Sequence, residues 1–280
     1  MLACLALICR EPIAHALQDK LPVIKERITQ KATPAITGSP LLPAPLKNVP
    51  EQILHRKGYT ASYHREHSIP NLVAYNKDLK IPNWVAWELT PEKLVERESR
   101  TDKFLPDPDL PENQAVTTDD YKRSGMDRGH MCPAGDNRWH WKAMQESFYM
   151  TNICPQNHNL NRGDWKELED ACRLWTKKEG KLYIVCGPVL YRQKHRTIGR
   201  KHKVTVPEAF FKVILSTRNG HPKAIGFIFK NLSGNHPLKN YVNSVDEVER
   251  ITGIDFFPAL PDDVEKKVEA MQDLNLWSFR

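Results

Sequence analysis

The segment 124–133 concentrates groups that can do chemistry. An acid, a cation, a glycine and an imidazole occupy four consecutive positions, Asp127 to His130. Histidine has an unperturbed pKa near neutrality, so His130 can accept a proton from water. The neighbouring Arg128 can hold a phosphate group. The alternative without a catalytic role is a polar turn with a local Asp–Arg ion pair, and a match of four residues alone does not exclude it.

A second polar segment, 151–173, contains a candidate metal ligand. We expect Asn161 to open an amphipathic helix that closes at Gly180. The amide oxygen of asparagine is a ligand for hard cations, and Mg²⁺ keeps several waters, so a single asparagine is chemically sufficient. The apolar stripe that predicts this helix consists of Trp165, Leu168, Cys172 and Trp175.

Glu169 and Arg173 are four residues apart on the same predicted helix. This spacing places both on a face beside the apolar stripe, so they can reach a groove while the stripe anchors the helix. The alternative is an ion pair that only stabilises the helix weakly. The choice between these interpretations depends on the segment around His130.

The surrounding elements indicate an α+β fold, because strands and helices do not alternate regularly along the chain. An Asn219-Gly220 pair predicts a hairpin turn, and Gly187-Pro188 is expected to end a buried strand. Ser244 is a candidate N-cap for a helix at 245–251. Further elements are expected as strands at 59–63, 71–75, 84–89, 182–186, 204–206, 210–215 and 224–229, and as a helix at 262–271.

Composition narrows the class of protein. The 280 residues are 40% hydrophobic and 27% charged, which is near the globular average and excludes wholesale disorder. No run of about 18 apolar residues occurs, so the sequence predicts no stable membrane span. The formal charge of +7 favours polyanionic partners such as nucleic acid, although charge alone is a weak argument.

The chain divides into three expected regions. Residues 1–30 read as a signal, leader or tail, since an apolar start is followed by an Ala-x-Ala triplet at 14–16. Five prolines at 31–50 predict an extended linker, and the folded domain is expected at 51–280. This interpretation favours a secreted or periplasmic (cell-envelope) protein, with a cytoplasmic location as the alternative.

The two polar segments together closely resemble the DNA/RNA non-specific endonuclease family. The resemblance rests on the Asp-Arg-Gly-His quartet at 127–130, on Thr151–Gln156 and on Leu160–Trp165. This family includes secreted bacterial nucleases and mitochondrial endonuclease G, and its site is of the ββα-metal, or His-Me finger, class. Similar segments extend the match over about 55–275, and they lie at 83–89, 187–188, 245–249 and 252–257.

The resemblance implies a fold, a reaction and a role for each matching residue. The fold would be a ββα-metal core on a mostly antiparallel sheet flanked by helices, and the enzyme would hydrolyse DNA and RNA without sequence or sugar preference to give 5′-phosphates. His130 would be the general base, and Asn161 would be the only direct protein ligand of Mg²⁺, with Mn²⁺ or another divalent cation as alternatives. Glu169 would act on the metal through a water. The remaining roles are phosphate binding by Arg173, catalytic arginines at Arg128 and Arg100, and supporting positions at Asp127 and Asn152.

A basic run at 192–203 carries six lysines and arginines. Arg196, Arg200 and Lys201 are candidates to grip the nucleic-acid backbone, and the alternative is a solvated loop. The resemblance also makes a homodimer a possible oligomeric state.

Two competing functions come from other classes of protein. One is a catalytically inactive, nucleic-acid-binding homologue, against which the intact His130 and Asn161 argue. The other is a zinc-stabilised module built on Cys132, Cys154 and nearby histidines, although the sequence contains no Cys-x-x-Cys spacing. Cys132 and Cys154 could also form a disulfide, which Cα atoms more than about 7 Å apart would refute.

Overall fold

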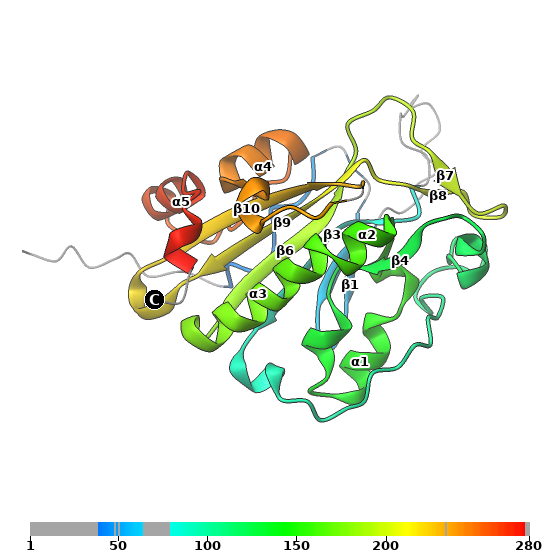
Figure 1. Ribbon diagram of the computed structural model, residues 1–280, viewed down its shortest axis with the longest axis horizontal. Coiled ribbons are helices and arrows are strands. Elements are labelled where there is room, and N and C mark those ends of the chain that lie inside the picture. Colours follow the sequence, from blue (N-terminus) through cyan, green and yellow to red (C-terminus); the bar gives the residue numbers. More distant parts are fainter. Residues whose placement is uncertain (1–38, 48, 50, 64–78, 233, 278–280) are drawn as a thin grey trace, which may run out of the picture. The chain divides into compact units, whose positions relative to one another are not determined.

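The computed structural model of the chain describes residues 39–47, 49, 51–63, 79–232 and 234–277 (Figure 1). The predicted leader at 1–30 and the predicted strand at 71–75 fall outside these residues. The described residues belong to one compact unit that spans 34–280. Among them, no helix combines the length and the apolar character needed to cross a membrane.

The described part of the predicted linker packs on the folded unit. Leu41 and Leu46 contact an apolar core, and the Ala44 amide donates to the Asp255 carbonyl at 2.9 Å. Residues 39–47 contain no helix, as the prolines predict.

A seven-stranded sheet of order β1-β2-β3-β6-β9-β10-β11 forms the centre of the unit. Every neighbouring pair in it is antiparallel, which confirms the α+β class. The strands are β1 (Gln52–His55), β2 (Thr60–Tyr63), β3 (Pro82–Leu89), β6 (Leu182–Val189), β9 (Ala209–Ser216), β10 (Lys223–Lys230) and β11 (Val242–Asn243).

Helices cover both faces of this sheet. Helix α3 (Asp164–Glu179) lies across one face, and α4 (Val245–Thr252) and α5 (Asp262–Glu269) lie against the other (Figure 1). Successive residues of a strand point to opposite faces. In β9, Phe210 and Ile214 therefore join the core with α3, whereas Phe211 and Val213 join the core with α4 and α5.

Strand β6 corrects one prediction, because it continues through Gly187-Pro188 to Val189. Proline is tolerated there since β6 is paired with β9 alone at this point, its pairing with β3 having ended at Cys186. Gly187 is required by a close approach of the neighbouring strand. A Cβ at this position would lie 2.6 Å from the Asn83 carbonyl oxygen.

The amphipathic helix also begins later than predicted. Asn161 does not open α3 but lies in a separate short helix, α2 (His158–Arg162), which is capped by the Asn157 side chain. Gly163 separates the two helices, and a Cβ there would lie 2.6 Å from the Asn159 carbonyl oxygen. The predicted end of α3 is confirmed, since Gly180 follows it with φ +80°.

Two short antiparallel pairs lie outside the main sheet. They are β4 (Asp127–His130) with β5 (Ile153–Gln156), and β7 (Thr197–Ile198) with β8 (Val204–Thr205). The predicted turn at Asn219-Gly220 joins β9 to β10, and Ser244 caps α4 by accepting from the Glu247 amide at 3.1 Å, so both predictions are confirmed. The remaining helical segments are α1 (Trp141–Ser147) and short 3₁₀ turns at Pro91–Leu94, Thr118–Tyr121, Ala134–Asn137, Met150–Asn152, Arg218–Gly220, Leu238–Tyr241 and Leu274–Trp277.

Carboxyl groups between α4 and α5 make the stability depend on pH. Ligand oxygens of Asp246, Glu249 and Glu269 lie within 4.8 Å of one another. Burial, together with repulsion from neighbouring carboxylates, raises the pKa of Glu249 to about 7 and that of Glu269 to about 9. Because both folded-state pKa values exceed the ordinary glutamate value, the folded state binds extra protons. Stability is therefore highest below the unfolded pKa and is lost as the pH rises toward 9.

We expect Glu269→Gln to raise the unfolding temperature at about pH 9 and to change it little at about pH 5, because the substitution removes a charge that only the higher pH creates. Thermal unfolding across this range measures the effect. Asp263→Asn, at an exposed position of the same helix, is the matched control. Parallel curves for wild type and Glu269→Gln would contradict the prediction.

Candidate active site

The β4–β5 pair presents the residues of the Asp-Arg-Gly-His segment. Gly129 faces Cys154 across the pair, and His130 faces Ile153. A Cβ at Gly129 would lie 2.1 Å from the Gln156 side-chain oxygen, so glycine is needed for the two strands to approach.

Asn152 fixes the turn that follows His130. Its side chain is fully buried, its Oδ1 accepts from the Cys132 amide at 2.9 Å, and its Nδ2 donates to the carbonyls of Cys132 and Ser147 at 2.9 and 2.8 Å. Asn152 thus supports the backbone around His130 from a buried position.

The His130 imidazole lies among aromatic rings. Its centroid is 5.4 Å from that of Phe104 and 4.7 Å from that of Phe148. Its Nε2 is buried and has no hydrogen-bond partner in the described part of the chain. Burial, and next the positive charges of Arg100 and Arg128, lower the pKa of His130 to about 3. The imidazole is therefore neutral at physiological pH, which is the form that can accept a proton.

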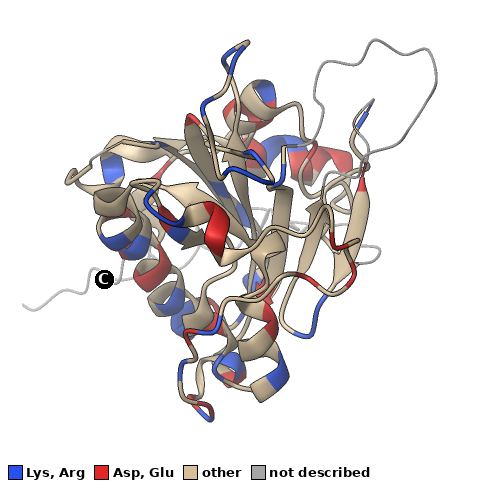
Figure 2. Cartoon of the chain, turned by 90° about the vertical axis from the view of Figure 1, so that its right-hand side faces the viewer, with Lys and Arg blue, Asp and Glu red and all other residues tan. Residues whose placement is uncertain are grey.

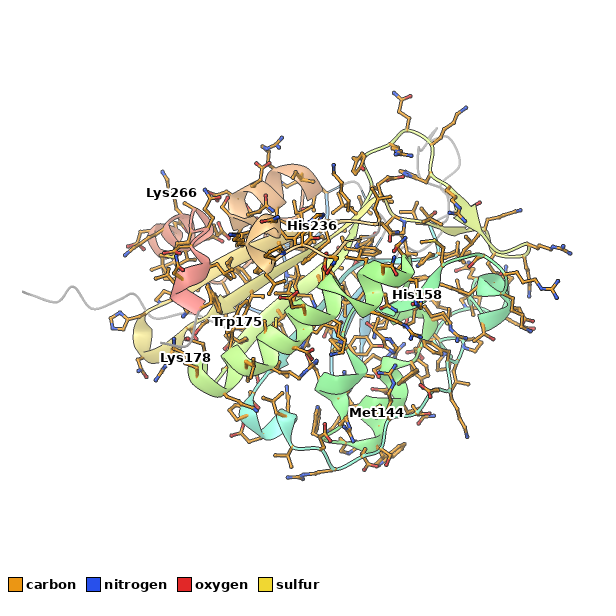
Figure 3. All side chains as sticks on the ribbon, in the orientation of Figure 1. Met144, His158, Trp175, Lys178, His236 and Lys266 are labelled. Carbon is orange, nitrogen blue, oxygen red and sulfur yellow. The ribbon has the colours of Figure 1, made fainter. Side chains whose placement is uncertain are left out.

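Asp127 holds the candidate metal ligand. The Asn161 Nδ2 donates to Asp127 Oδ2 at 2.9 Å, and His158 Nδ1 lies 3.1 Å from both carboxylate oxygens. Burial acts against the Asp127 carboxylate, but these hydrogen bonds outweigh it and lower the pKa of Asp127. His158 lies at the start of α2, where Figure 3 labels it. Since Asp127 takes the amide nitrogen, the Asn161 Oδ1 is left without a hydrogen bond to the described residues.

A cavity of about 330 Å³ brings Arg128 and Asn161 to one surface. The Arg128 guanidinium lies 4.3 Å from the ring centroid of Phe104, which lines the same cavity and covers His130. Lys122 and Arg162 also line it and add positive charge that our sequence interpretation did not include.

Of the two predicted side chains on α3, Arg173 reaches a second cavity, of about 540 Å³, which Arg100 also lines, whereas Glu169 is not among its lining residues. Arg173 donates to Asp136 at 2.8 Å and also bonds Asp170, so its ion-pair partners are not Glu169, as the alternative interpretation had it, but two residues that sequence reasoning missed. Spacing on the helix could have indicated Asp170, three residues away, but nothing local indicated Asp136. Burial raises the pKa of Glu169 to about 7, against the opposing charges of Lys212 and Arg173.

The predicted site residues are therefore spread over two neighbouring surfaces. Arg128 and Asn161 line the first cavity, and Arg100 and Arg173 line the second. His130 itself is not among the residues that line either cavity. Its ring lies against Phe104, which lines the first cavity, and against Phe148, whose ring centroid lies 5.5 Å from the Arg100 guanidinium carbon.

The basic run forms a hairpin beside this site. Arg196, Arg200 and Lys201 are exposed around β7 and β8, and they line a cavity of about 890 Å³ with Lys122 and Arg123. Figure 2 looks onto the side from which this hairpin projects in Figure 1. Lys122 lines both this cavity and the one at Asn161, so positive charge continues from the hairpin to the site.

The cysteines support neither of the other structural interpretations. Cys132 and Cys154 are free and buried, so the suggested disulfide is absent. Among the described residues, neither thiol belongs to a group of three or more side chains placed to share a metal ion, so the structure does not support a zinc site there.

Two antiparallel strands followed by a helix, with a neutral histidine on the first strand and an asparagine on the helix, define the ββα-metal class of nucleases. The sequence agrees with this class, because the model of the DNA/RNA non-specific endonuclease family matches residues 51–263. The chain belongs to the DNA/RNA non-specific endonuclease family.

Relatives and a solved structure agree with this placement. The chain is 35% identical over 225 residues to the mitochondrial nuclease EXOG of Danio rerio, a match of 75% of this chain and 65% of that protein. It is 32% identical over 270 residues to a nuclease of Nostoc, covering 92% of each chain. The EndoG chain of an EndoG/EndoGI complex superposes with a TM-score of 0.67 at 28% identity, covering 75% of this chain and 86% of that one. The chain spans 65% and 61% of the Danio rerio and Xenopus laevis EXOG proteins.

Proposed function

We propose that this chain hydrolyses the phosphodiester bonds of DNA and RNA without sequence preference, with Mg²⁺ as the cofactor and His130 as the general base. The observation that carries the proposal is the neutral imidazole of His130, which lies against Phe104 of one arginine-lined cavity and against Phe148, the ring beside Arg100. A base and fixed positive charge are the two requirements for attack of water on an anionic diester.

The residues present fit a hard divalent cation. Asp127 holds the Asn161 nitrogen, which leaves the amide oxygen available as a ligand. Glu169 is half-buried on α3, where it can accept a hydrogen bond from the hydration shell of such an ion. When bound, the cation acts as a Lewis acid that offsets negative charge on the phosphoryl group.

The remaining chemistry belongs to the side chains of the chain itself. The neutral His130 imidazole takes a proton from the attacking water while the water oxygen bonds to phosphorus, and the bond from phosphorus to the 3′ oxygen breaks. Arg173 and Arg100 neutralise charge on the phosphate, and Arg128 does so from the other cavity. The products are a 5′-phosphate and a 3′-hydroxyl. The anionic diester also offsets the arginine charges that lower the pKa of His130, so substrate binding makes the imidazole a stronger base.

Two enzymatic measurements test the proposal. Supercoiled plasmid and RNA are incubated with the protein in a Mg²⁺ titration and in EDTA, and the ends of the products are analysed. Both substrates should be cut only with the divalent ion, and the DNA ends should be joined by ligase without prior phosphorylation. Products ending in 3′-phosphates would refute the direction of cleavage. Binding without cleavage would establish the alternative of an inactive, nucleic-acid-binding homologue.

The basic hairpin predicts a specific dependence on salt. Arg196, Arg200 and Lys201 bind backbone phosphates in this proposal, and each such ion pair releases condensed counterions. We expect the triple substitution to glutamine to weaken DNA binding and to reduce the slope of log affinity against log salt by about 1 for each phosphate that is no longer neutralised. Fluorescence anisotropy with a labelled duplex measures it. An unchanged slope would show that this is a solvated loop.

A further inference from the structure

Lys212 is a fully buried lysine in the middle of the central sheet. It lies on β9 between Phe211 and Val213, its exposed fraction is 0%, and its Nζ has no hydrogen-bond partner in the described part of the chain. Strand alternation directs it to the same face as Phe210 and Ile214, which is the face covered by α3. An unpaired ammonium group in an apolar core is costly, so it requires an explanation.

The surroundings of Lys212 belong to the active-site side of the molecule. Its Nζ lies 4.3 Å from the ring centroid of Trp165 on α3 and 5.3 Å from that of Trp87 on β3. The Trp87 Nε1 donates to Asp136 at 3.0 Å, and Asp136 in turn holds Arg173. The lysine therefore lies beneath the part of α3 that carries Glu169 and Arg173.

Only some of the neighbouring acidic groups are available to this cation. Asp136 already binds Trp87 and Arg173. The thiols of Cys172 and Cys186 are protonated, because burial raises the pKa of each to about 12. Glu169 is different, since its carboxyl group makes no hydrogen bond to the described residues.

Electrostatics link the two groups in both directions. Burial raises the pKa of Glu169, and Lys212 is the foremost charge that opposes this rise. Burial also works against the Lys212 ammonium, but its acidic neighbours, Cys186 first and then Glu169, raise its pKa above the usual lysine value, and with the thiols protonated near neutral pH Glu169 is the foremost of them that carries charge. Two oppositely charged groups in a medium of low polarity attract strongly even without direct contact.

We propose that Lys212 is a positioning residue, whose buried ammonium holds the Glu169 carboxylate from beneath and so fixes its orientation toward the active site. The Trp165 and Trp87 rings keep the ammonium in place by cation–π contact. The effect of Lys212 on catalysis rests on the role proposed above for Glu169. The attraction between the two side chains does not depend on that role.

A double-mutant cycle in stability tests the pair without any assay of activity. Wild type, Lys212→Met, Glu169→Gln and the double variant are unfolded by heat at about pH 8. Lys212→Met should lower the unfolding temperature by roughly 5–15 °C, because breaking one side of a buried pair is strongly destabilising. Adding Glu169→Gln should restore at least about half of this loss, since it removes the charge left unpaired.

A matched control separates charge from packing. Ile214→Val lies on the same strand and face, and it should destabilise the wild-type protein and the Glu169→Gln variant to the same extent. If Lys212→Met proves insoluble, recovery of folded protein in the double variant supports the proposal. Strict additivity of Lys212→Met and Glu169→Gln, or failure of the double variant to fold, overturns it.

Plasmid cleavage supplies the second readout. Lys212→Met should lower the rate about tenfold or more in wild type but cause little further loss in the Glu169→Gln background, because both substitutions remove the same function. Equal loss in both backgrounds would overturn the positioning role. A wild-type protein that cuts neither DNA nor RNA, yet shows the coupling in stability, would refute the proposed function and leave the pair intact.

Discussion

Replacing His130 with alanine should lower the rate of plasmid and RNA hydrolysis by about 10²–10⁴-fold, which is the contribution of a positioned general base. The loss should fall on turnover, with substrate affinity nearly unchanged, because Arg100 and Arg128 remain in place to bind phosphate. Steady-state cleavage rates, with anisotropy for DNA affinity, measure the two quantities separately.

The control for this substitution is His221→Ala. His221 is exposed at the turn between β9 and β10, away from both arginine-lined cavities, so its loss should leave cleavage at the wild-type rate. A His130→Ala variant that is folded and retains more than about a tenth of the wild-type rate would exclude the imidazole as the base.

Replacing Asn161 with alanine should have the second largest effect. Loss of groups that merely orient a metal ligand costs about 10–100-fold in affinity or activity, so loss of the proposed sole protein ligand should cost about 100-fold or more. Half-maximal activity should therefore require much more Mg²⁺. The unfolding temperature without metal should change little, because the Asn161 side chain is only partly buried.

Two further variants make this test specific. Asn159→Ala removes an exposed asparagine from the same short helix and should leave the Mg²⁺ requirement unchanged. Asn161→Asp replaces the donor to Asp127 with a second negative charge, so it should impair activity. Because it keeps an oxygen ligand, the loss at high Mg²⁺ should be smaller than that of Asn161→Ala. An Asn161→Ala enzyme with the wild-type Mg²⁺ dependence would place the metal elsewhere.

The elements that sequence predicted well are those whose signals are local. The stripe from Trp165 to Trp175, Gly180, Ser244 and the Asn219-Gly220 turn each act within a few residues. The wrong predictions concern positions whose local structure depends on a strand or loop that is distant in the sequence. Gly187-Pro188 looks like a strand end until its neighbour β3 is known to have stopped pairing at Cys186.

The candidate site shows the same division. His130, Asn161 and Glu169 could be selected because they stand in short motifs. The groups that set their behaviour could not, since Phe148 beside His130 and Lys212 beneath α3 come from segments with no distinctive pattern. The pKa of His130 near 3 is a property of this packing and not of the motif.

The four cysteines that lie within the described residues have a practical consequence. All are buried and unpaired, and burial raises the pKa of each thiol, so alkylating reagents should react with them slowly in the native protein. In a variant with Cys4 and Cys9 replaced by serine, a single cysteine introduced on the exposed hairpin around β7 could then be labelled selectively with a fluorophore. Such a probe would report the arrival of a nucleic-acid strand in real time, with the four buried thiols left in place.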